Sequence, residues 1–310
     1  MPGGGLSFQQ TVPRSLAHRR AIGEVFVADT AAAGADGFLA AIQLPRAHML
    51  WADRPAGHHD PLSALEAIRQ AVTVIGHRYL GLPASDPGSF QRLTFCVEDL
   101  SAFHDDEHTP LEGVVRIRIG HDHGHLADST FHATLTIGDR LAMTVDGGGT
   151  VFARADYVEL RNHQRSMRPA EPTHARVVAP IDPHIVGRRD ERNVVIGAPQ
   201  VTADGPQQFT VIIDRRHPSF FDHDYDHVPG PLLLEALRQA AIATVHRSDD
   251  SVEVIWAITS AEVNFEGFAE LDAAIHCIAG PLLETGFIEV SLEQFGRQIT
   301  TGRIELTAIS

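Results

Sequence analysis

The sequence predicts an α+β protein built from two repeats, each a long central helix wrapped by an antiparallel sheet. The first reason is a duplication, because Leu65–Ala71 (Leu-Glu-Ala-Ile-Arg-Gln-Ala) recurs as Leu234–Ala240 (Leu-Glu-Ala-Leu-Arg-Gln-Ala) at an offset of 169 residues. The second is that similar β-like runs surround each helix in the same order. Gap-free matching from residue 46 to residue 78 indicates a duplicated unit. The other matched pairs are Arg46 and Arg215, His48 and His217, and His58 and His227.

Repeat one runs from residue 16 to residue 160, with two β-like runs before its helix and four after it. These runs are Ala21–Ala28, Gly37–Leu44, Gln91–Leu100, Leu111–Ile119, Ser129–Ile137 and Arg140–Tyr157. The last run contains three successive glycines, 147–149, which indicate a bulge or a break between two strands. Three histidines, at 121, 123 and 125, alternate between two runs, and we interpret this segment as a hairpin turn rather than a metal site.

Repeat two runs from residue 186 to residue 310 and keeps the same order. Residues 161–185 contain several prolines and no apolar period, so they are predicted to form an irregular connection. The predicted strands of repeat two are Gln207–Arg215, Val252–Phe265, Leu271–Ile278, Thr285–Gln294 and Ile299–Ala308.

Each predicted helix has clear start signals. Asp60 can cap the first N–H groups and Pro61 suits the first helical position, and Gly230 and Pro231 take those two positions in repeat two. Apolar residues recur at spacings of three and four, which predicts helices near residues 61–80 and 231–247. A buried helix wrapped by a strongly bent antiparallel sheet is the hot-dog arrangement. We therefore expect a double hot-dog, with two units packed sheet to sheet about a pseudo-twofold axis.

The same polar residues lie on both helices. Glu66, Arg69 and Gln70 occupy positions i, i+3 and i+4 and so share one helix side, as do their counterparts Glu235, Arg238 and Gln239. A single copy would fit an internal salt bridge that satisfies itself equally well. Buried ion pairs are costly, however, and apolar residues often replace them without loss of stability. Two matched copies on buried helices therefore favour a functional role.

Composition narrows the class of protein. A chain of 310 residues fits about two domains. A net charge of −15 argues against binding nucleic acid or an anionic membrane, and neither a membrane span nor a secretory signal is evident, so we expect a cytoplasmic protein. Cys96 and Cys277 are not related by the repeat offset and are expected to be buried thiols rather than a disulfide. All 25 basic residues are arginine, which excludes a lysine that forms a Schiff base or acts as a general base.

Two motifs carry a resemblance to known families. His217–Phe221, followed by Asp226–Gly230 and Glu235, resembles the hot-dog 3-hydroxyacyl-carrier-protein dehydratases, in which a histidine before the helix and an acid five residues after a Pro-Gly turn form the site. A closer resemblance is to the A-factor biosynthesis family, γ-butyrolactone synthases with two hot-dog repeats. It spans residues 16 to about 247, although Met49–Trp51 departs from the two aromatic residues usual there. The segments that carry it are Leu16–Arg19, Glu24–Phe26, Pro45–His48, His59–Leu62, Glu66–Ala71, Val186–Arg188, Glu191–Val195, Phe221–His223 and Asp226–Gln239.

This resemblance implies an acyltransferase that moves a β-ketoacyl group from an acyl carrier protein thioester to the hydroxyl of dihydroxyacetone phosphate. The product then leads to a γ-butyrolactone or butenolide signalling molecule of secondary metabolism. No cofactor and no metal is expected. The partners expected are the carrier protein and the phosphate acceptor, and the chain is expected to be a monomer with pseudo-dimeric repeats or a homodimer.

Each chemical task has a candidate residue. The backbone N–H of Gly230, at the positive end of a helix, would polarise the thioester carbonyl. Glu235 or Glu66, with a pKa raised by burial, would act as the base, and Glu235 is expected to matter more because Asp60 places a carboxylate at the other helix start. The remaining assignments are His227 or His58 to orient the base or substrate, Arg69 or Arg238 to bind phosphate, and Gln70 and Gln239 to contact substrate.

Alternatives remain open at this point. A dehydratase or thioesterase would use the same fold and the same acids, and a non-catalytic protein that binds an acyl ligand is a further option. The arginine beside each glutamate favours an enzyme that binds a phosphate-bearing acceptor over these alternatives. The arginine-rich connection is either a solvated linker or a basic landing surface for an acidic carrier protein. Its members are Arg161, Arg165, Arg168, Arg176, Arg188, Arg189 and Arg192.

Overall fold

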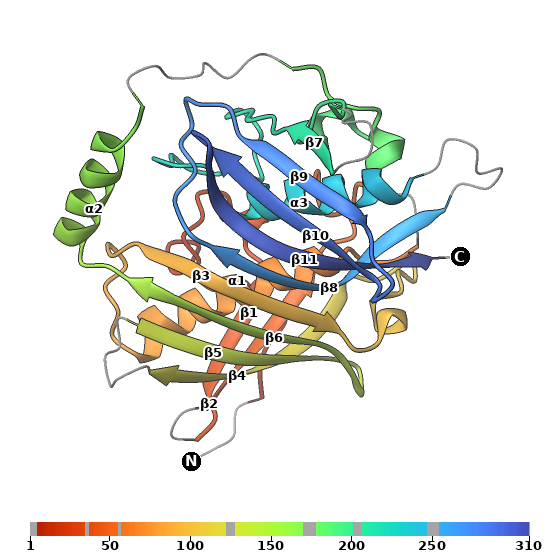
Figure 1. Ribbon diagram of the computed structural model, residues 1–310. Helices are drawn as coiled ribbons and strands as arrows, with labels where there is room; N and C mark the ends of the chain where they lie inside the picture. The colour runs from red at the N-terminus through yellow and green to blue at the C-terminus, as the bar shows by residue number, and fades with distance from the viewer. Residues whose placement is uncertain are drawn as a thin grey trace. The chain divides into compact units, whose positions relative to one another are not determined.

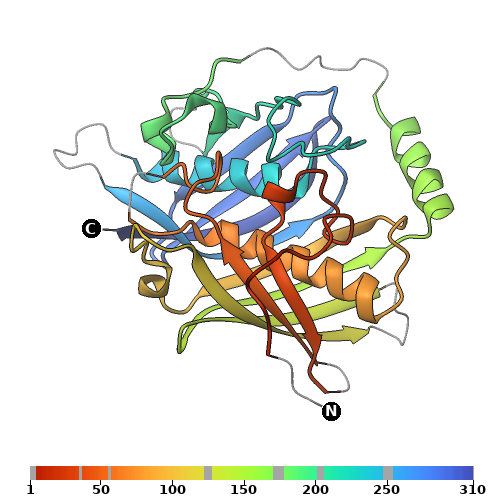
Figure 2. The same cartoon turned by 180° about the vertical axis from the view of Figure 1, so that it is seen from behind.

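The computed structural model divides into two compact units, each with one of the repeated helices (Figures 1 and 2). The first unit comprises Met1–Ala52 and Gly57–Asn162, and the second comprises Asp53–Ala56 and His163–Ser310. The structure describes residues 5–34, 37–54, 57–121, 128–169, 178–200, 206–246 and 254–309. Within these ranges, no helix has the length and apolar character needed to cross a membrane.

The first unit is an antiparallel sheet with a long helix, α1 (Pro61–Tyr79), on one face. Its strands follow the order β1-β2-β4-β5-β6-β3, and α1 contacts β1 and β2. Two short 3-10 helices complete it, η1 (Ile22–Glu24) and η2 (Leu100–Phe103). The strands are β1 (Val27–Ala32), β2 (Gly37–Leu44), β3 (Gly88–Val97), β4 (Leu111–His121), β5 (Asp128–Ile137) and β6 (Arg140–Val151).

The second unit repeats this plan around α3 (Gly230–Val245). Its strands follow the order β8-β11-β10-β9-β7, and α3 lies against the sheet with most of its contacts to β9 and β10 (Figure 1). The 3-10 helices η4 (Pro183–Val186) and η5 (Glu191–Asn193) precede β7. The strands are β7 (Gln207–Thr210), β8 (Ile255–Phe265), β9 (His276–Leu282), β10 (Phe287–Gln294) and β11 (Arg297–Ile309).

The two helices begin differently. The side chain of Asp60 caps α1 by accepting from Leu62 N at 3.0 Å, as predicted. The N-cap of α3 is Pro229, which offers no side-chain acceptor, and Gly230 is the first helical residue. The sequence-based pairing of Gly230 with Asp60 was therefore wrong by one residue, because Gly230 occupies the position of Pro61. The prediction that the second helix is buried is confirmed, since every residue from 232 through 243 is buried.

Most predicted strands are present, and the main error lies after the last strand of the first unit. The predicted strand Arg140–Tyr157 ends at Val151, and a helix that the sequence analysis missed, α2 (Arg154–Ser166), follows it. This segment has no proline or glycine, and Tyr157 and Arg161, one helical turn apart, are its buried residues. The irregular connection predicted from residue 161 was therefore wrong in its first part.

Smaller differences have local causes. In place of the strand Ala21–Ala28 the structure has η1 and then β1, and the predicted strand Gln207–Arg215 is only four residues long. Residues 271–275 precede β9 and form no continuous strand, although Ile275 O accepts from Val211 N at 2.9 Å. Cys277 is buried, but Cys96 is exposed, because it lies on the outer side of β3. Both thiols are free. The predicted turn at residues 122–127 lies outside the described residues.

The glycine run at 147–149 faces a bulge, as the sequence predicted, although the bulge is in the neighbouring strand. The register of β3 on β6 shifts between Phe90 and Arg92, opposite Gly149 and Gly148, and β6 itself stays continuous. A Cβ at Gly149 would lie 2.1 Å from the backbone oxygen of Ser89. The close approach of two backbones therefore requires glycine here.

We predict that Gly149→Ala lowers the free energy of unfolding by about 1–3 kcal/mol, because the new methyl group meets backbone that cannot move without breaking the register. Gly148→Ala is the matched control, since its Cβ would meet its nearest neighbours at 3.5 Å, an ordinary contact. That variant should change the stability by less than about 1 kcal/mol. Urea unfolding of both variants measures this, and equal effects would contradict the prediction.

Candidate functional site

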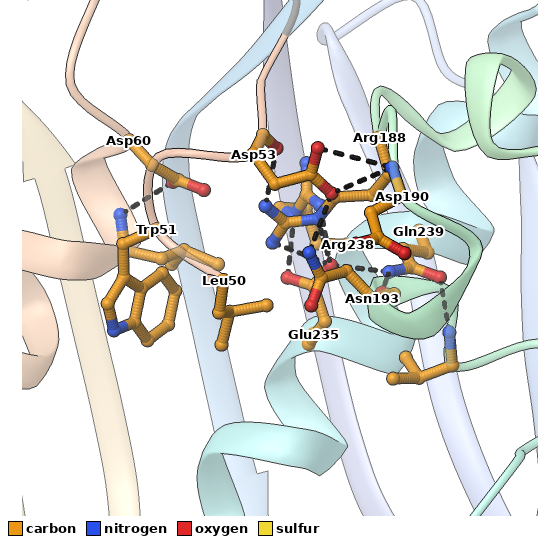
Figure 3. Close-up of polar contacts among 12 residues, drawn as sticks. Leu50, Trp51, Asp53, Asp60, Arg188, Asp190, Asn193, Glu235, Arg238 and Gln239 are labelled. Atoms are coloured by element: carbon orange, nitrogen blue, oxygen red, sulfur yellow. Dashed lines mark hydrogen bonds and ion pairs between the residues drawn. The ribbon is translucent and has the colours of Figure 1, made fainter. Parts of the chain in front are cut away.

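A buried carboxylate lies between two guanidinium groups in the second unit (Figure 3). Glu235 accepts from Arg238 Nε at 2.9 Å and from Arg188 Nε at 3.1 Å. All three side chains are buried, with Glu235 and Arg188 almost inaccessible to solvent. One negative and two positive charges give this cluster a net positive charge.

The first unit holds the same cluster. Glu66 accepts from Arg69 Nε at 2.8 Å and also pairs with Arg19. Arg19 and Arg188 are related by the repeat offset of 169 residues, so the whole arrangement is duplicated. The sequence analysis gave neither residue this role. The signal was available, because both arginines match at the offset by which the helices match.

The same backbone conformation presents each of these two arginines. The residue before Arg19 is His18, with φ of 50°, and the residue before Arg188 is Gly187, with φ of 68°. Few residues other than glycine adopt this left-handed region. Nε2 of His18 lies 2.8 Å from Nε2 of His77, near the end of α1, which holds the histidine in this conformation.

Gln239 connects the cluster to the chain before β7. Its Nε2 donates to Asn193 O at 2.8 Å and to Glu235, and its Oε1 accepts from Val195 N at 2.9 Å. In the first unit Gln70 repeats this pattern, with its Nε2 donating to Glu24 O and its Oε1 accepting from Phe26 N. Both N–H donors of each amide are used in this way. We therefore revise the substrate-contacting role predicted for Gln70 and Gln239 to a structural one.

The matched histidines His48 and His217 contact the same two segments as Gln70 and Gln239. Nε2 of His217 lies 2.9 Å from Asn193 Oδ1, and its Nδ1 accepts from Phe220 N at 3.3 Å. His48 similarly accepts from Trp51 N at 3.2 Å and lies 3.3 Å from Glu24 Oε1. Because both ring nitrogens of each histidine have a protein partner, these side chains position the backbone.

The charges around the two buried glutamates lower their pKa values, which is opposite to the sequence-based prediction. Burial by itself raises the pKa of Glu235, but the positive charges of Arg188 and Arg238, with the hydrogen bond from Gln239, outweigh it and lower that pKa to about 2. The pKa of Glu66 is lowered well below its usual range by Arg19 and Arg69. The prediction of bases with raised pKa values was therefore wrong, because it counted burial and not the second arginine.

Asp53 adds a further interaction that the sequence analysis did not foresee. Its carboxylate accepts from the backbone N of Arg189 at 3.0 Å and from Asn193 Nδ2 at 2.7 Å (Figure 3). Its backbone oxygen accepts from Arg188 Nη1 at 2.9 Å. Asp53 thus fixes both the loop that carries Arg188 and the guanidinium itself.

The start of α3 is open on its exposed side. Gly230 is exposed, and a Cβ there would have no neighbour within 4 Å among the described residues. Pro231 has no N–H, and Leu232 N and Leu233 N donate to Pro229 O at 3.0 and 3.2 Å, which leaves the N–H of Gly230 as the group at this helix start that could meet a ligand. This geometry suits a carbonyl oxygen, and the role of Gly230 in polarising a thioester stays a prediction.

His227, two residues before the N-cap of α3, has a carboxylate partner. Its Nδ1 lies 2.7 Å from Asp226 Oδ1, and the edge of its ring packs against Phe268 with centroids 4.7 Å apart. An acceptor at Nδ1 favours the tautomer in which Nε2 accepts protons. In repeat one, Gly57 stands at the position of Asp226, so His58 lacks this neighbour.

In the described part of the arginine-rich connection, most arginine side chains are buried or form ion pairs. Arg161 and Arg188 are buried, and Arg165, Arg168 and Arg192 each pair with a carboxylate. Arg189 is exposed, and residue 176 lies outside the described part of the chain. Five of the six described arginines are therefore buried or paired, and the landing surface for a carrier protein stays a prediction.

Comparison with known proteins agrees with the architecture. The model of the A-factor biosynthesis hotdog domain matches residues 5–153 and 170–310. A protein of Streptomyces virginiae named 2-oxo-3-(phosphooxy)propyl 3-oxoalkanoate synthase is 32% identical over 276 residues, covering 88% of each chain. A protein of the same name from Streptomyces griseus is 30% identical over 236 residues, covering 73% of each chain.

Solved structures extend the likeness at the level of the fold. The dehydratase domain from the CurF module of curacin polyketide synthase has a TM-score of 0.52 at 8% identity, covering 91% of this chain and 97% of its own. A CurK dehydratase in an inactive variant has a TM-score of 0.51 at 13% identity, covering 92% and 98%. With the two-part family match, these confirm the predicted double hot-dog fold.

We predict that Glu235→Gln lowers the free energy of unfolding by about 3–5 kcal/mol near neutral pH, because two buried guanidinium groups lose their counter-charge. A carboxylate whose folded pKa is lowered stabilises above its unfolded pKa, and this contribution is lost as pH falls towards the folded value. The difference from wild type should therefore shrink between about pH 4.5 and pH 2.

Urea midpoints at pH 7, 5 and 3 test this prediction. Glu284→Gln, at an exposed position in the turn after β9, is the control and should follow the wild type at each pH. A difference between Glu235→Gln and wild type that stays constant over this range would contradict the ionised state of Glu235.

Proposed function

We propose, because the chain belongs to the A-factor biosynthesis hotdog family, that it is an acyltransferase that joins a 3-oxoacyl group to dihydroxyacetone phosphate. The observation that carries this proposal is the 32% identity, over both repeats, to an enzyme named 2-oxo-3-(phosphooxy)propyl 3-oxoalkanoate synthase. That name describes an ester of a 3-oxo acid with a phosphorylated hydroxyketone. The product would serve γ-butyrolactone or butenolide biosynthesis.

The donor in this proposal is a 3-oxoacyl thioester of an acyl carrier protein. The hydroxyl oxygen of the acceptor attacks the thioester carbonyl, forming a C–O bond, and the C–S bond then breaks. The proton lost by the hydroxyl passes through a base to the leaving thiolate, so the thiol and the ester are the products. The protein must therefore polarise one carbonyl, move one proton and hold one phosphate.

Carbonyl polarisation is assigned to the start of α3. The N–H groups of an uncapped helix start carry partial positive charge, which favours an oxygen that becomes negative during attack. Gly230 leaves room for the thioester to approach, because it lacks a side chain and has open space around it. The start of α1 is less suitable, because the carboxylate of Asp60 already accepts from Leu62 N there.

Proton transfer is assigned to His227 rather than to Glu235. A carboxylate with a pKa of about 2 is a weak proton acceptor near neutral pH, since general-base catalysis works best when the pKa lies near the working pH. The imidazole of His227 has the Asp226 carboxylate on Nδ1, and Nε2 is then the nitrogen that accepts the proton. Glu235 instead holds Arg188 and Arg238 in place.

Phosphate binding is assigned to the positively charged clusters. Arg69 uses Nε and Nη2 for Glu66, and Arg238 uses the same two groups for Glu235, so a phosphate would meet the Nη1 edge of Arg69. The side chain of Arg69 is 28% exposed and that of Arg238 only 6%. Arg69 is therefore the more accessible of the two arginines.

A dehydratase, a thioesterase and an acyl-binding protein remain the alternatives to be tested. Wild-type protein is incubated with a 3-oxoacyl carrier protein, with and without dihydroxyacetone phosphate, and the products are analysed by mass spectrometry. We expect a phosphorylated ester that forms only with the acceptor. Free acid formed without the acceptor would indicate a thioesterase, and a donor that is bound but unchanged would indicate a binding protein. Loss of water from a 3-hydroxyacyl donor, supplied in a parallel incubation, would indicate a dehydratase.

In that assay His227→Gln should lower kcat by about 10²–10⁴, because the variant lacks a base at this position. His246→Gln, at an exposed position just after α3, is the control and should retain wild-type kcat. Full activity in His227→Gln would reject the assignment of the base.

Replacing Arg69 by leucine should raise KM for dihydroxyacetone phosphate about tenfold or more, because one hydrogen bond between charged groups contributes about 1.5–3 kcal/mol. KM for the acyl donor should not change. Arg238→Leu is the contrasting variant, since its buried position predicts loss of stability in addition to any effect on KM. An unchanged acceptor KM in Arg69→Leu would show that Arg69 does not bind the phosphate.

A further inference from the structure

Arginine side chains at the end of α2 contact two loops of the second unit. Nη2 of Arg165 lies 3.1 Å from the backbone oxygen of Asp226 and 3.4 Å from its Oδ2. Nε of Arg165 lies 3.9 Å from Glu270 Oε2. Arg168, one turn along, pairs with Glu270 and, at 3.0 Å, with Asp272.

These two loops form the surroundings of His227. Val228 N donates to Ala269 O at 2.8 Å, which joins the loop before α3 to the loop after β8. The ring of His227 contacts Phe268 across this junction. Arg165 therefore reaches one acidic residue on each of these two loops, Asp226 and Glu270.

The Glu270 side of this arrangement is rigid. The backbone N of Glu270 donates to Gln294 Oε1 at 2.7 Å, and its backbone oxygen accepts from Gln294 Nε2 at 2.9 Å. The same Nε2 also donates to Ala273 O at 3.0 Å. Gln294 and Glu270 are both buried. Arg165 is thus held against a fixed loop.

Stability alone does not account for the contact between Arg165 and Asp226. Their side chains are 42% and 38% exposed, and an ion pair that exposed contributes little to the stability of a protein. The carboxylate divides its oxygens, with Oδ1 on His227 Nδ1 and Oδ2 towards Arg165. This division fixes the direction in which Asp226 presents its acceptor to the imidazole.

We infer that Arg165 is a positioning residue for the acyl transfer, which holds Asp226 so that His227 keeps its proton on Nδ1 and its basic nitrogen at Nε2. The inference rests on the proposed function, because it assumes that His227 is the base. It also assigns α2 a role, since this helix carries Arg165 to the site.

The charged groups around His227 predict the direction in which the pH profile changes when Arg165 is replaced. Tyr225 faces His227 from its own loop and packs against His223, Asp226 is the partner of His227, Arg165 comes from α2, and Glu270 comes from the loop after β8. Removing the positive charge of Arg165 leaves Asp226 less compensated, which favours the imidazolium. The acid limb of the pH profile of kcat should then move to higher pH.

The test compares Arg165→Gln, Arg165→Lys and a matched control. Arg303→Gln serves as that control, because Arg303 and Glu262 form an equally exposed pair at 44% each, on β11 and β8. We expect Arg165→Gln to lower kcat about tenfold, as loss of a residue that orients an imidazole ligand does, and to move the acid limb of the pH profile to higher pH. KM for dihydroxyacetone phosphate should stay unchanged, Arg165→Lys should restore part of kcat, and Arg303→Gln should match wild type.

A second measurement is independent of activity. In ¹⁵N NMR spectra, wild-type His227 should show a protonated Nδ1 above its pKa, and Arg165→Gln should show a mixture of tautomers. If Arg165→Gln matches Arg303→Gln in kcat, pH profile and tautomer while His227→Gln is inactive, this inference is overturned and the proposed function stands. If wild-type protein makes no ester, the proposed function fails, and a tautomer unchanged by Arg165→Gln would then also refute the positioning role.

Discussion

The interaction on which each unit depends is an ionised glutamate held between two arginines, one from the helix and one from the segment 47 residues before the glutamate. A glutamine one turn along the helix extends this cluster to the backbone that leads into the next strand. No member can be removed alone without leaving a charge or a polar group buried and uncompensated. The cluster therefore fixes the helix relative to the preceding chain, and with it the direction of the helix start.

Because of this cluster, holding charge in place and transferring the proton are separate tasks, although the sequence alone assigned Glu235 as the base. The glutamate is kept ionised by its neighbours, so it holds charge in place and exchanges protons poorly near neutral pH. The second unit has another group for proton transfer, because Asp226 and His227 precede a helix start that no side chain caps. The first unit has Gly57 and Asp60 at the positions of Asp226 and Pro229, which fits our proposal that carbonyl activation belongs to the second unit.

Much of this could be predicted from local patterns. The duplication identified both helices and the Glu, Arg and Gln positions, and the helix start signals were correct to within one residue. The sign of the pKa shift depends on Arg19 and Arg188, which match at the repeat offset but whose long-range contact with the glutamates no local pattern predicts. The helix α2 was missed since two of its apolar residues, Tyr157 and Val158, favour strands in isolation. The contacts of Asp53 and Arg165 likewise join residues whose spacing carries no periodic signal.

The most direct test of this account is the ionisation state of Glu235, followed by the chemical shift of its side-chain carboxyl carbon in ¹³C-labelled protein. We predict that the carboxyl carbon keeps the shift of an ionised group throughout the range from pH 7 down to pH 4, while the exposed glutamates begin to titrate. A Glu235 carboxyl that takes up a proton at or above pH 5 would contradict the account and would restore this residue as the candidate base.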